Sequence, residues 1–576
     1  MGHHGGMPDD VPTTPRRIAD RYVADLVALD PLLATSLGLP DGADEFPDLS
    51  PAGSAADAEL RRRTLAELEG AVALAGGMPG LDDAERSCAR LLAERLEAAL
   101  ALHEAGEDLR TLDTLFSPLH SVRSVFLLMP SSGEQDWATI SRRMSRVPQA
   151  LSGYRSSLQA GLDAGLTAGP AQADAVVPQL GTWLTGDSGP WFADFARRGP
   201  QSLRADLDAA AAQATAAVAE LRDWLADTYA PAAAHTPDAV GAERYALWAR
   251  YWTGSNLDLE GAYAYGWSEF ARLDAELRAQ AELVLPGAGV LEAMDHLNEH
   301  GRVIEGVDAV VAHLQSLMDG AIEALDGVHF ELAEPIRTVE AMVAPPGSAA
   351  APYYTRPSLD FTRPGRTWLP VLGRTRFPVW DLVSTWYHEG VPGHHLQLAQ
   401  WVYVAPQLSR YQTSVGSVGA NLEGWALYAE RLMDELGFLA DPGDRIGYLD
   451  AQQMRAVRVI IDLGMHLELP IPADQGVPEP FHPGERWTPA LAREFFGLNS
   501  GRPRDFLDSE LIRYLGMPGQ AISYKLGERA WLAGREAAQA AHAARGETFD
   551  AKAWHMAALS QGSLGLDDLV DELSQL

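Results

Sequence analysis

WYHEGVPGHHLQ, residues 386–397, places three histidines and a glutamate within eight residues of an apolar, helix-like segment. A hydrolytic zinc centre needs about three His or Glu ligands, an open position for water and a nearby carboxylate that takes the proton from that water. The segment contains most of this set. It therefore predicts a catalytic zinc site carried on a helix.

The spacing of the histidines predicts that this helix is interrupted. In the common HExxH pattern, histidines at i and i+4 share one helix face, but here the fourth residue after His388 is Pro392. On an unbroken helix His395 would lie about 10 Å further along the axis than His388, too far for one metal ion. Pro392 lacks a backbone N–H, and the flanking glycines tolerate unusual dihedral angles. We therefore expect a bulge or a looped-out turn after Glu389 that draws the histidines together.

The residues of this segment and of a later helix can be assigned as zinc ligands and as the general base. His388 is the expected first ligand and Glu389 the general base. For the second ligand we prefer His394, which needs the smaller insertion, and His395 remains the alternative. The third ligand is expected to be Glu423, which begins a second helical segment, NLEGWALYAE (421–430).

Glu430 lies two turns along the same helix face as Glu423. It has two interpretations. It is either an outer carboxylate that supports a ligand, or a solvated charge.

The chain resembles a large bacterial family catalogued as a domain of unknown function, which is marked by HExxPGHH and EGWALYAE motifs. The segments that carry this resemblance are HEGVPGHHLQ (388–397), EGWALYAE (423–430), RAVRVIIDLGMH (455–466), PGQAISYKLGE (518–528), DPLLATSLGL (30–39) and YYTRPSLDFTRPG (353–365). They cover nearly the whole chain. The family is distantly similar to the mainly helical glutamate-ligated zinc peptidases (gluzincins), and this similarity implies one zinc ion per chain in a deep cleft.

Composition is that of a large soluble enzyme. The chain has 576 residues, 47% of them hydrophobic and 22% charged, so it can bury a substantial core. Its net charge of −34 argues against nucleic acid and anionic membranes as partners. The single cysteine, Cys88, excludes an internal disulfide and a thiolate metal site.

No apolar run in the first residues has the form of a secretory signal, and no later stretch reaches the ~18 apolar residues of a membrane span. We therefore expect a cytoplasmic protein. The sequence leaves the oligomeric state open.

Hydrophobic periodicity predicts a mainly α fold, and the resemblance to the helical zinc peptidases implies a large zinc-peptidase-like architecture. Residues 1–328 form its helical N-terminal part, and residues 329–576 form a catalytic part with a small sheet, the metal helix and C-terminal helices, all in one cooperative unit. Strand-like alternation occurs at 329–332, 336–340 and 351–355. The expected helices lie near 14–30, 56–75, 81–106, 136–165, 203–229 and 259–283.

Several further residues are candidates for the site. Tyr354, on an expected edge strand, either holds an extended substrate or packs a short hairpin. In the segment 455–466, Arg458, Asp462 and His466 share one helix face. Either Asp462 orients a zinc-bound imidazole and His466 donates to the oxyanion, or the three residues form an intrahelical ion-pair ladder.

The C-terminal region offers donors for the oxyanion and for a substrate carboxylate. A peptidase needs a donor about 3 Å from the developing negative charge, and Tyr524 and Tyr514 are the candidates. Arg513 or Lys525 is expected to bind a substrate carboxylate. Each of these four residues also has an ordinary interpretation, as a packed tyrosine or a cation at the rim.

Together these features predict a zinc-dependent peptidase that acts on peptides or small oligopeptides. Two alternatives remain: a zinc hydrolase of a non-peptide amide or modified amino acid, and a non-catalytic binding protein on a peptidase fold. The presence of Glu389, the base, argues against the second alternative, because a lapsed site does not need it.

Overall fold

The computed structural model describes residues 14–39, 42–186, 189–345 and 351–576, and it is built mainly from α-helices with two small sheets. The mainly α prediction is thus confirmed. The first helices are α1 (Pro15–Leu29), α2 (Pro31–Ser36), α3 (Pro51–Leu74), α4 (Asp83–Glu104), α5 (Pro118–Leu128), α6 (Glu134–Ser145), α7 (Val147–Asp163), α8 (Pro170–Thr185), α9 (Trp191–Ala196), α10 (Arg204–Trp224), α11 (Ala230–Ala233), α12 (Gly241–Thr253) and α13 (Leu259–Val284). The later helices are α14 (Val290–His300), α15 (Val307–Leu325), α16 (Leu382–Glu389), α17 (His394–Tyr403), α18 (Arg410–Thr413), α19 (Gly419–Glu435), α20 (Pro442–Leu467), α21 (Pro489–Leu498), α22 (Arg504–Gly516), α23 (Ser523–Arg545), α24 (Ala551–Ser560) and α25 (Leu566–Gln575).

Helix boundaries follow local sequence signals. The helices α1, α3 and α20 begin at a proline, which needs no hydrogen-bond partner for its nitrogen in the first turn. The side chains of Ser50 and Asp441 accept backbone N–H groups at the starts of α3 and α20. The segment expected as one helix at 136–165 is instead two helices, α6 and α7, because Pro148 lies in the first turn of α7 and starts a new helix there.

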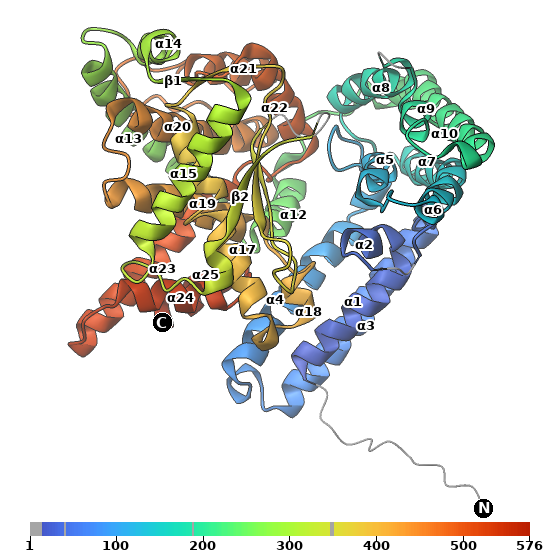
Figure 1. Cartoon of the computed structure of the whole chain (residues 1–576), viewed down its shortest axis with the longest axis horizontal. Coiled ribbons are helices and arrows are strands. Elements are labelled where there is room, and N and C mark those ends of the chain that lie inside the picture. Colours follow the sequence, from blue (N-terminus) through green and yellow to red (C-terminus); the bar gives the residue numbers. More distant parts are fainter. Residues whose placement is uncertain (1–13, 40–41, 187–188, 346–350) are drawn as a thin grey trace, which may run out of the picture.

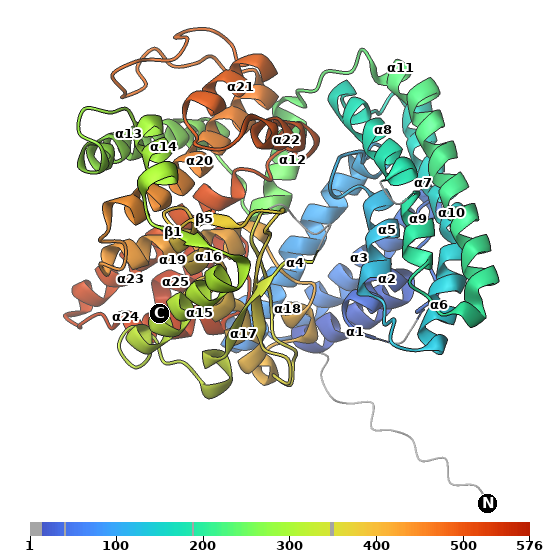
Figure 2. The same cartoon turned by 45° about the horizontal axis from the view of Figure 1, so that its top comes forward.

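Buried apolar side chains form two clusters in the described part of the chain. One cluster gathers residues between Leu112 and Ala233, from α5 to α11. The other joins α1–α4 to the helices from α12 onwards and to the sheets. Figures 1 and 2 show α5–α10 grouped on the side of the molecule opposite α13–α25. The expected division at residue 328 stays a prediction.

The strands are short. β2 (Val339–Val343), β4 (Gly365–Leu369) and β3 (Tyr353–Thr355) form one sheet in the order β2-β4-β3, with β2 parallel and β3 antiparallel to β4. β1 (Val303–Glu305) pairs antiparallel with β5 (Arg376–Pro378). The three-stranded sheet lies against α17, as expected for a sheet beside the metal helix.

One expected strand is wrong. Residues 329–332 form no strand but continue a turn after α15, in which Gly327 donates to the carbonyl of Phe330 (2.8 Å) and His329 donates to that of Leu325 (2.9 Å). Phe330 is fully buried. Phe330 and Leu332 therefore belong to the buried apolar core and not to a sheet.

The C-terminal helices pack around α20, which is buried along nearly its whole length and contacts α13, α16 and α23. Beside it, α19 and α23 cross very closely at Gly424 and Gly527. A Cβ atom on Gly424 would lie 2.3 Å from the Gly527 carbonyl carbon. This close approach brings Glu423 on α19 towards Tyr524 on α23.

No helix in the described ranges is both long and apolar enough to cross a membrane. The cytoplasmic location stays a prediction.

Candidate metal centre

The break between α16 and α17 creates the candidate site. Helix α16 ends at Glu389 and α17 begins at His394, so the chain is interrupted where Pro392 and its flanking glycines predict it. Gly393 donates to the carbonyl of Tyr387 (3.0 Å). A Cβ atom on Gly393 would lie 1.9 Å from the carbonyl oxygen of His388. Only glycine therefore fits at this turn, and the turn folds the start of α17 back towards His388.

Three side chains converge beside this turn: His388, His394 and Glu423. The His388 Nε2 atom lies 3.3 Å from Glu423 Oε2, and the His394 Nε2 atom lies 3.6 Å from the same oxygen. One ligand atom from each of the three residues lies within 4.8 Å of the others. Ligand atoms of a tetrahedral zinc site are about 3.4 Å apart. The donor set and its spacing thus fit a zinc ion.

Helix α19, which carries Glu423, is hydrogen-bonded to the turn between α16 and α17. Trp425, two residues further on in α19, is fully buried, and its indole N–H contacts the carbonyl oxygens of Pro392 (2.9 Å) and Gly393 (3.1 Å). The Glu423 Oε2 atom is buried and has no hydrogen-bond partner in the described ranges. A buried carboxylate oxygen that faces two imidazole nitrogens without a hydrogen bond of its own favours a cation at the centre of the cluster.

His388 is held from its other side by Glu430. The imidazole Nδ1 atom lies 2.8 Å from Glu430 Oε1, and the hydroxyl of Ser384 donates to the second carboxylate oxygen. Arg455 lies 3.8 Å from Glu430 Oε1. Glu430 is fully buried, so it is not a solvated charge. Its carboxylate fixes the orientation of the ring and leaves Nε2 to face Glu423.

Charges within the cluster shift the pKa values of its members. Burial alone would lower the pKa of His388, but its contacts with Glu423 and Glu430 outweigh burial and raise that pKa to about 9. Burial would raise the pKa of Glu423, yet its contacts with His388 and His394 lower it instead. The two acids thus keep a negative charge and attract positive charge to the point between the imidazoles.

Glu389, the predicted base, follows His388 at the end of α16 and is only 8% exposed. Burial raises the pKa of its carboxyl and the charge of Glu423 adds to this effect, whereas His388 and His394 oppose it. Its side chain forms no hydrogen bond with any other residue that the structure describes. A general base works best with a pKa near the operating pH. The position and the direction of the pKa shift both suit that role.

His395 points away from the cluster. Its Nε2 atom donates to the carbonyl of Ile336 (2.7 Å), and its Nδ1 atom accepts from the Tyr354 hydroxyl (2.9 Å). The ring is fully buried, and burial lowers its pKa to about 4. The structure therefore brings His394, and not His395, to His388 and Glu423. It also commits the Tyr354 hydroxyl to this bond, which agrees with the packing interpretation of that strand.

Tyr524 lies close to the cluster. It is partly exposed at the start of α23, and its ring faces the guanidinium groups of Arg458 (4.9 Å) and Arg455 (5.9 Å). Burial raises the pKa of its hydroxyl, and the charge of Glu423 adds to this shift. Tyr524 is thus a neutral donor near the candidate ligands, and its predicted role at the oxyanion stays a prediction.

Asp462 and His466 lie elsewhere. The Asp462 carboxylate accepts from the Tyr245 hydroxyl (2.6 Å) and from the N–H of Gly519 (3.0 Å). His466 is fully buried, and its Nε2 donates to the carbonyl of Tyr514 (3.0 Å). Neither residue faces the candidate ligands. Glu430, and not Asp462, contacts the His388 imidazole, and His466 supports the segment before α23.

Three expected substrate-binding residues belong to buried networks. The Tyr514 hydroxyl donates to Glu510 (2.7 Å) and accepts from Arg458 (2.8 Å), and Arg513 pairs with the same glutamate (2.6 Å). Lys525 is fully buried and contacts Gln452 (2.6 Å), Glu269 and Glu528. These groups are already paired inside the protein, so their contacts are structural. They are therefore not free to bind a substrate carboxylate as expected.

Sequence reasoning missed two contributors to the site. Ser384 lies four residues before His388 on α16, and this spacing indicates that the two side chains share one helix face. Trp425 is part of the EGWALYAE segment, but nothing in the sequence says that its indole reaches the carbonyls of the turn.

We predict that Glu430→Gln weakens zinc binding about 10–100-fold, because the amide cannot match the carboxylate that orients His388. Competition with a chelator of known affinity measures the change. Glu435→Gln is the matched control, since Glu435 lies on the same helix and is 42% exposed beside Arg535. Equal zinc affinity in the two variants would contradict the role given to Glu430.

With this geometry in place, comparison with known proteins identifies the relatives of the chain. A family described as "Bacterial protein of unknown function (DUF885)" matches residues 31–573. Among curated proteins, none matches the chain. The crystal structure of "the putative lipoprotein from Colwellia psychrerythraea" is similar, with a TM-score of 0.76 and 22% identity over 98% of this chain and 99% of that one. A second structure, of "a putative lipoprotein of unknown function from Shewanella oneidensis", has a TM-score of 0.73 and 16% identity over 97% of this chain and 99% of that one. These two likenesses concern the fold.

Proposed function

This chain belongs to the DUF885 family of bacterial proteins of unknown function, and we propose that it is a zinc-dependent metallohydrolase that cleaves peptides or small oligopeptides. One observation carries the proposal. His388, His394 and Glu423 converge from three helices to a spacing that suits one zinc ion, and the buried carboxyl of Glu389, the residue after His388, lies close enough to feel the charges of all three.

The composition of the site supports hydrolysis rather than a structural metal site. Structural zinc sites are usually closed by four protein ligands, commonly cysteines, whereas hydrolytic sites use three ligands and keep one position open. Here three candidate ligands are present, and the side chains of His394 (13% exposed) and Glu423 (24% exposed) reach the surface. A substrate could therefore approach from their side.

Zinc in such a site supplies a Lewis acid that makes water acidic enough to react near neutral pH. The chain's own residues do the rest. Glu389 takes the proton from the attacking water and passes it to the leaving amine. Glu430 keeps the His388 ring in place, and we assign Tyr524 as the donor to the developing oxyanion. The resemblance to the helical glutamate-ligated zinc peptidases agrees with these roles.

The chemistry of the site also fits the hydrolysis of a non-peptide amide or a modified amino acid, because metal-assisted attack is generic to the carbonyl group. A non-catalytic binding protein is the remaining alternative. The buried base Glu389 favours catalysis over that alternative, since a binding protein gains nothing from a buried acid beside the cluster.

Elemental analysis and a substrate panel test the proposal together. The untagged chain is expected to carry about one zinc ion and to hydrolyse members of a panel of unblocked peptides, with activity lost on chelation and restored by zinc. Acyl-amino acids in the same panel distinguish the second function. A chain that binds no zinc, or whose hydrolysis is the same with chelator present, would show that the proposal is wrong.

A further inference from the structure

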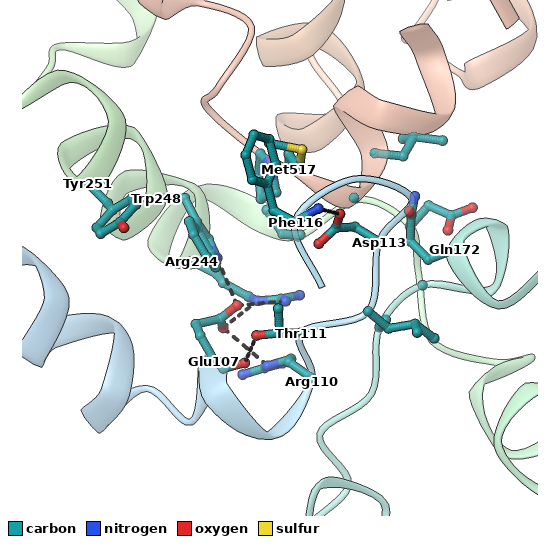
Figure 3. A pocket seen from close by; sticks show the side chains of 18 of the residues that line it. Glu107, Arg110, Thr111, Asp113, Phe116, Gln172, Arg244, Trp248, Tyr251 and Met517 are labelled. Atoms are coloured by element: carbon teal, nitrogen blue, oxygen red, sulfur yellow. Dashed lines mark hydrogen bonds and ion pairs between the residues drawn. The ribbon is translucent and has the colours of Figure 1, made fainter. Parts of the chain in front are cut away.

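A cavity of about 310 Å³ lies where the two apolar clusters meet, and it contains none of the candidate metal ligands. It is lined by the segment after α4, by parts of α8 and α12, and by Leu515–Pro518 before α23. Figure 3 shows it from close by. Ligand sites commonly occupy such junctions, and the volume is at the small end of the range of roughly 300–1,000 Å³ for ligand pockets.

One side of the cavity carries surplus positive charge. Glu107 is 3% exposed, and Arg244 binds its carboxylate through two hydrogen bonds of 2.6 and 2.9 Å. Arg110 shares the same carboxylate at 3.1 Å. Two guanidinium groups therefore share one carboxylate, which leaves one positive charge in excess. Burial, together with the neighbouring charge of Arg244, lowers the pKa of Arg110. An anionic group of a ligand would complete the balance.

Another side carries surplus negative charge. Asp113 is 4% exposed and accepts only the backbone N–H groups of Leu115 (2.7 Å) and Phe116 (2.6 Å) through its side chain. Asp238 accepts the N–H of Ala171 (3.1 Å), and burial raises its pKa. Neither aspartate forms an ion pair with a basic residue within the described ranges. In Figure 3, Asp113 and Gln172 lie across the cavity from Glu107 and Arg110.

An aromatic wall lies between the two charged sides. Trp248 and Trp252 stack at 6.4 Å, and Phe116 packs against Trp252 at 6.2 Å. Phe116 is 62% exposed, which is unusual for a phenylalanine and leaves its ring at the mouth of the cavity. Trp248 is fixed by its own hydrogen bond to Glu107 (2.8 Å). The wall offers a flat apolar surface to a hydrophobic side chain.

We propose that this cavity binds a small zwitterion, a free amino acid or dipeptide with an apolar side chain. Its carboxylate contacts Arg110 and Arg244, its ammonium group contacts Asp113 and Asp238, and its side chain packs on Phe116 and the tryptophans. The two surpluses of opposite charge, on different sides of one apolar wall, match the two ends of such a molecule. The proposal does not rest on the zinc function.

Calorimetric titration of the full-length, metal-free chain with L-leucyl-L-phenylalanine tests the proposal, because without metal the dipeptide is not consumed. We expect binding, and a loss of roughly tenfold or more in affinity for both the N-acetylated and the C-terminally amidated dipeptide, since each lacks one charged contact. No binding, or equal binding of the free and the capped forms, would overturn the proposal.

Substitutions at the cavity and at the metal cluster show where the dipeptide binds. Phe116→Ala removes an exposed ring, and Asp238→Asn keeps the acceptor for Ala171, so both should fold and bind the dipeptide about tenfold more weakly. Leu128→Ala is the control for an exposed apolar side chain, at 59% exposure outside the cavity, and should bind normally. His394→Ala should also bind normally. Loss of binding in His394→Ala with normal binding in Phe116→Ala would place the dipeptide at the metal cluster and refute the proposal.

Discussion

Replacing Glu389 by glutamine is expected to abolish hydrolysis while the chain still binds one zinc ion. The amide has nearly the shape of the carboxyl group but cannot accept the proton of the attacking water. Loss of a general base typically costs about 10²–10⁴-fold in rate. Glu389 is not among the three residues whose ligand atoms converge, so the metal content should not change. Steady-state kinetics on the best peptide of the panel, with zinc measured on the same sample, checks both parts.

The control for this variant is Glu331→Gln, which makes the same chemical change at a glutamate that is 73% exposed and pairs with Lys552. Its rate and its zinc content should equal those of the natural chain. If Glu389→Gln keeps a comparable rate, the base is another group. If it loses zinc, Glu389 is a ligand and the assignment of the cluster is wrong.

The sequence predicts the break in the metal helix because the cause of the break is local. Pro392 lacks an N–H, and Gly393 is required by a carbonyl only five residues earlier in the chain. The sequence does not show whether His394 or His395 faces His388 and Glu423. That choice depends on the rotation of α17, which is fixed by contacts of His395 with Tyr354 and with the carbonyl of Ile336, 41 and 59 residues away. Periodicity carries no information on such distant partners.

The same difference explains why the sequence could not decide between the two interpretations of the polar residues on α20. Helical spacing places Arg458, Asp462 and His466 on one face, and all three are buried. Their partners come from remote segments: Tyr245 is 217 residues from Asp462 in the chain, and Tyr514 is 56 residues from Arg458. Each of these residues finds at least one hydrogen-bond partner inside the core, as buried polar groups usually do. Their polarity was a sound signal of a network, but not of a catalytic one.

Lys525 follows the same pattern. A lysine beside Tyr524 and after a Pro-Gly break has the local features of a rim cation. Instead, the close crossing of α19 and α23 turns its side chain into the interior, where Glu269 and Glu528 neutralise it. A buried lysine needs such partners, because an unpaired charge in the core is strongly destabilising.

Substituting the adjacent histidines His394 and His395 one at a time should give opposite results. His394→Ala removes one of three ligand atoms and should weaken zinc binding about a hundredfold or more. Its effect on folding should be smaller than that of His395→Ala, because the His394 side chain is less buried than His395 and its Nδ1 atom has no hydrogen-bond partner in the part of the chain that the structure describes. His395→Ala should keep zinc but leave the buried Tyr354 hydroxyl and Ile336 carbonyl unpaired, at a cost of about 2–4 kcal/mol in the free energy of unfolding.

Zinc content after dialysis and thermal unfolding, both measured on each variant, separate the two effects. His395→Gln is a milder partner of His395→Ala, since its amide supplies one donor and one acceptor and should recover part of the lost stability while zinc stays bound. The adjacent position of the two residues makes them controls for each other, because any general disturbance of the turn after Gly393 would affect both. Zinc lost from His395→Gln and kept by His394→Ala would reverse the ligand assignment. Zinc kept by both variants would remove this turn from the metal centre altogether.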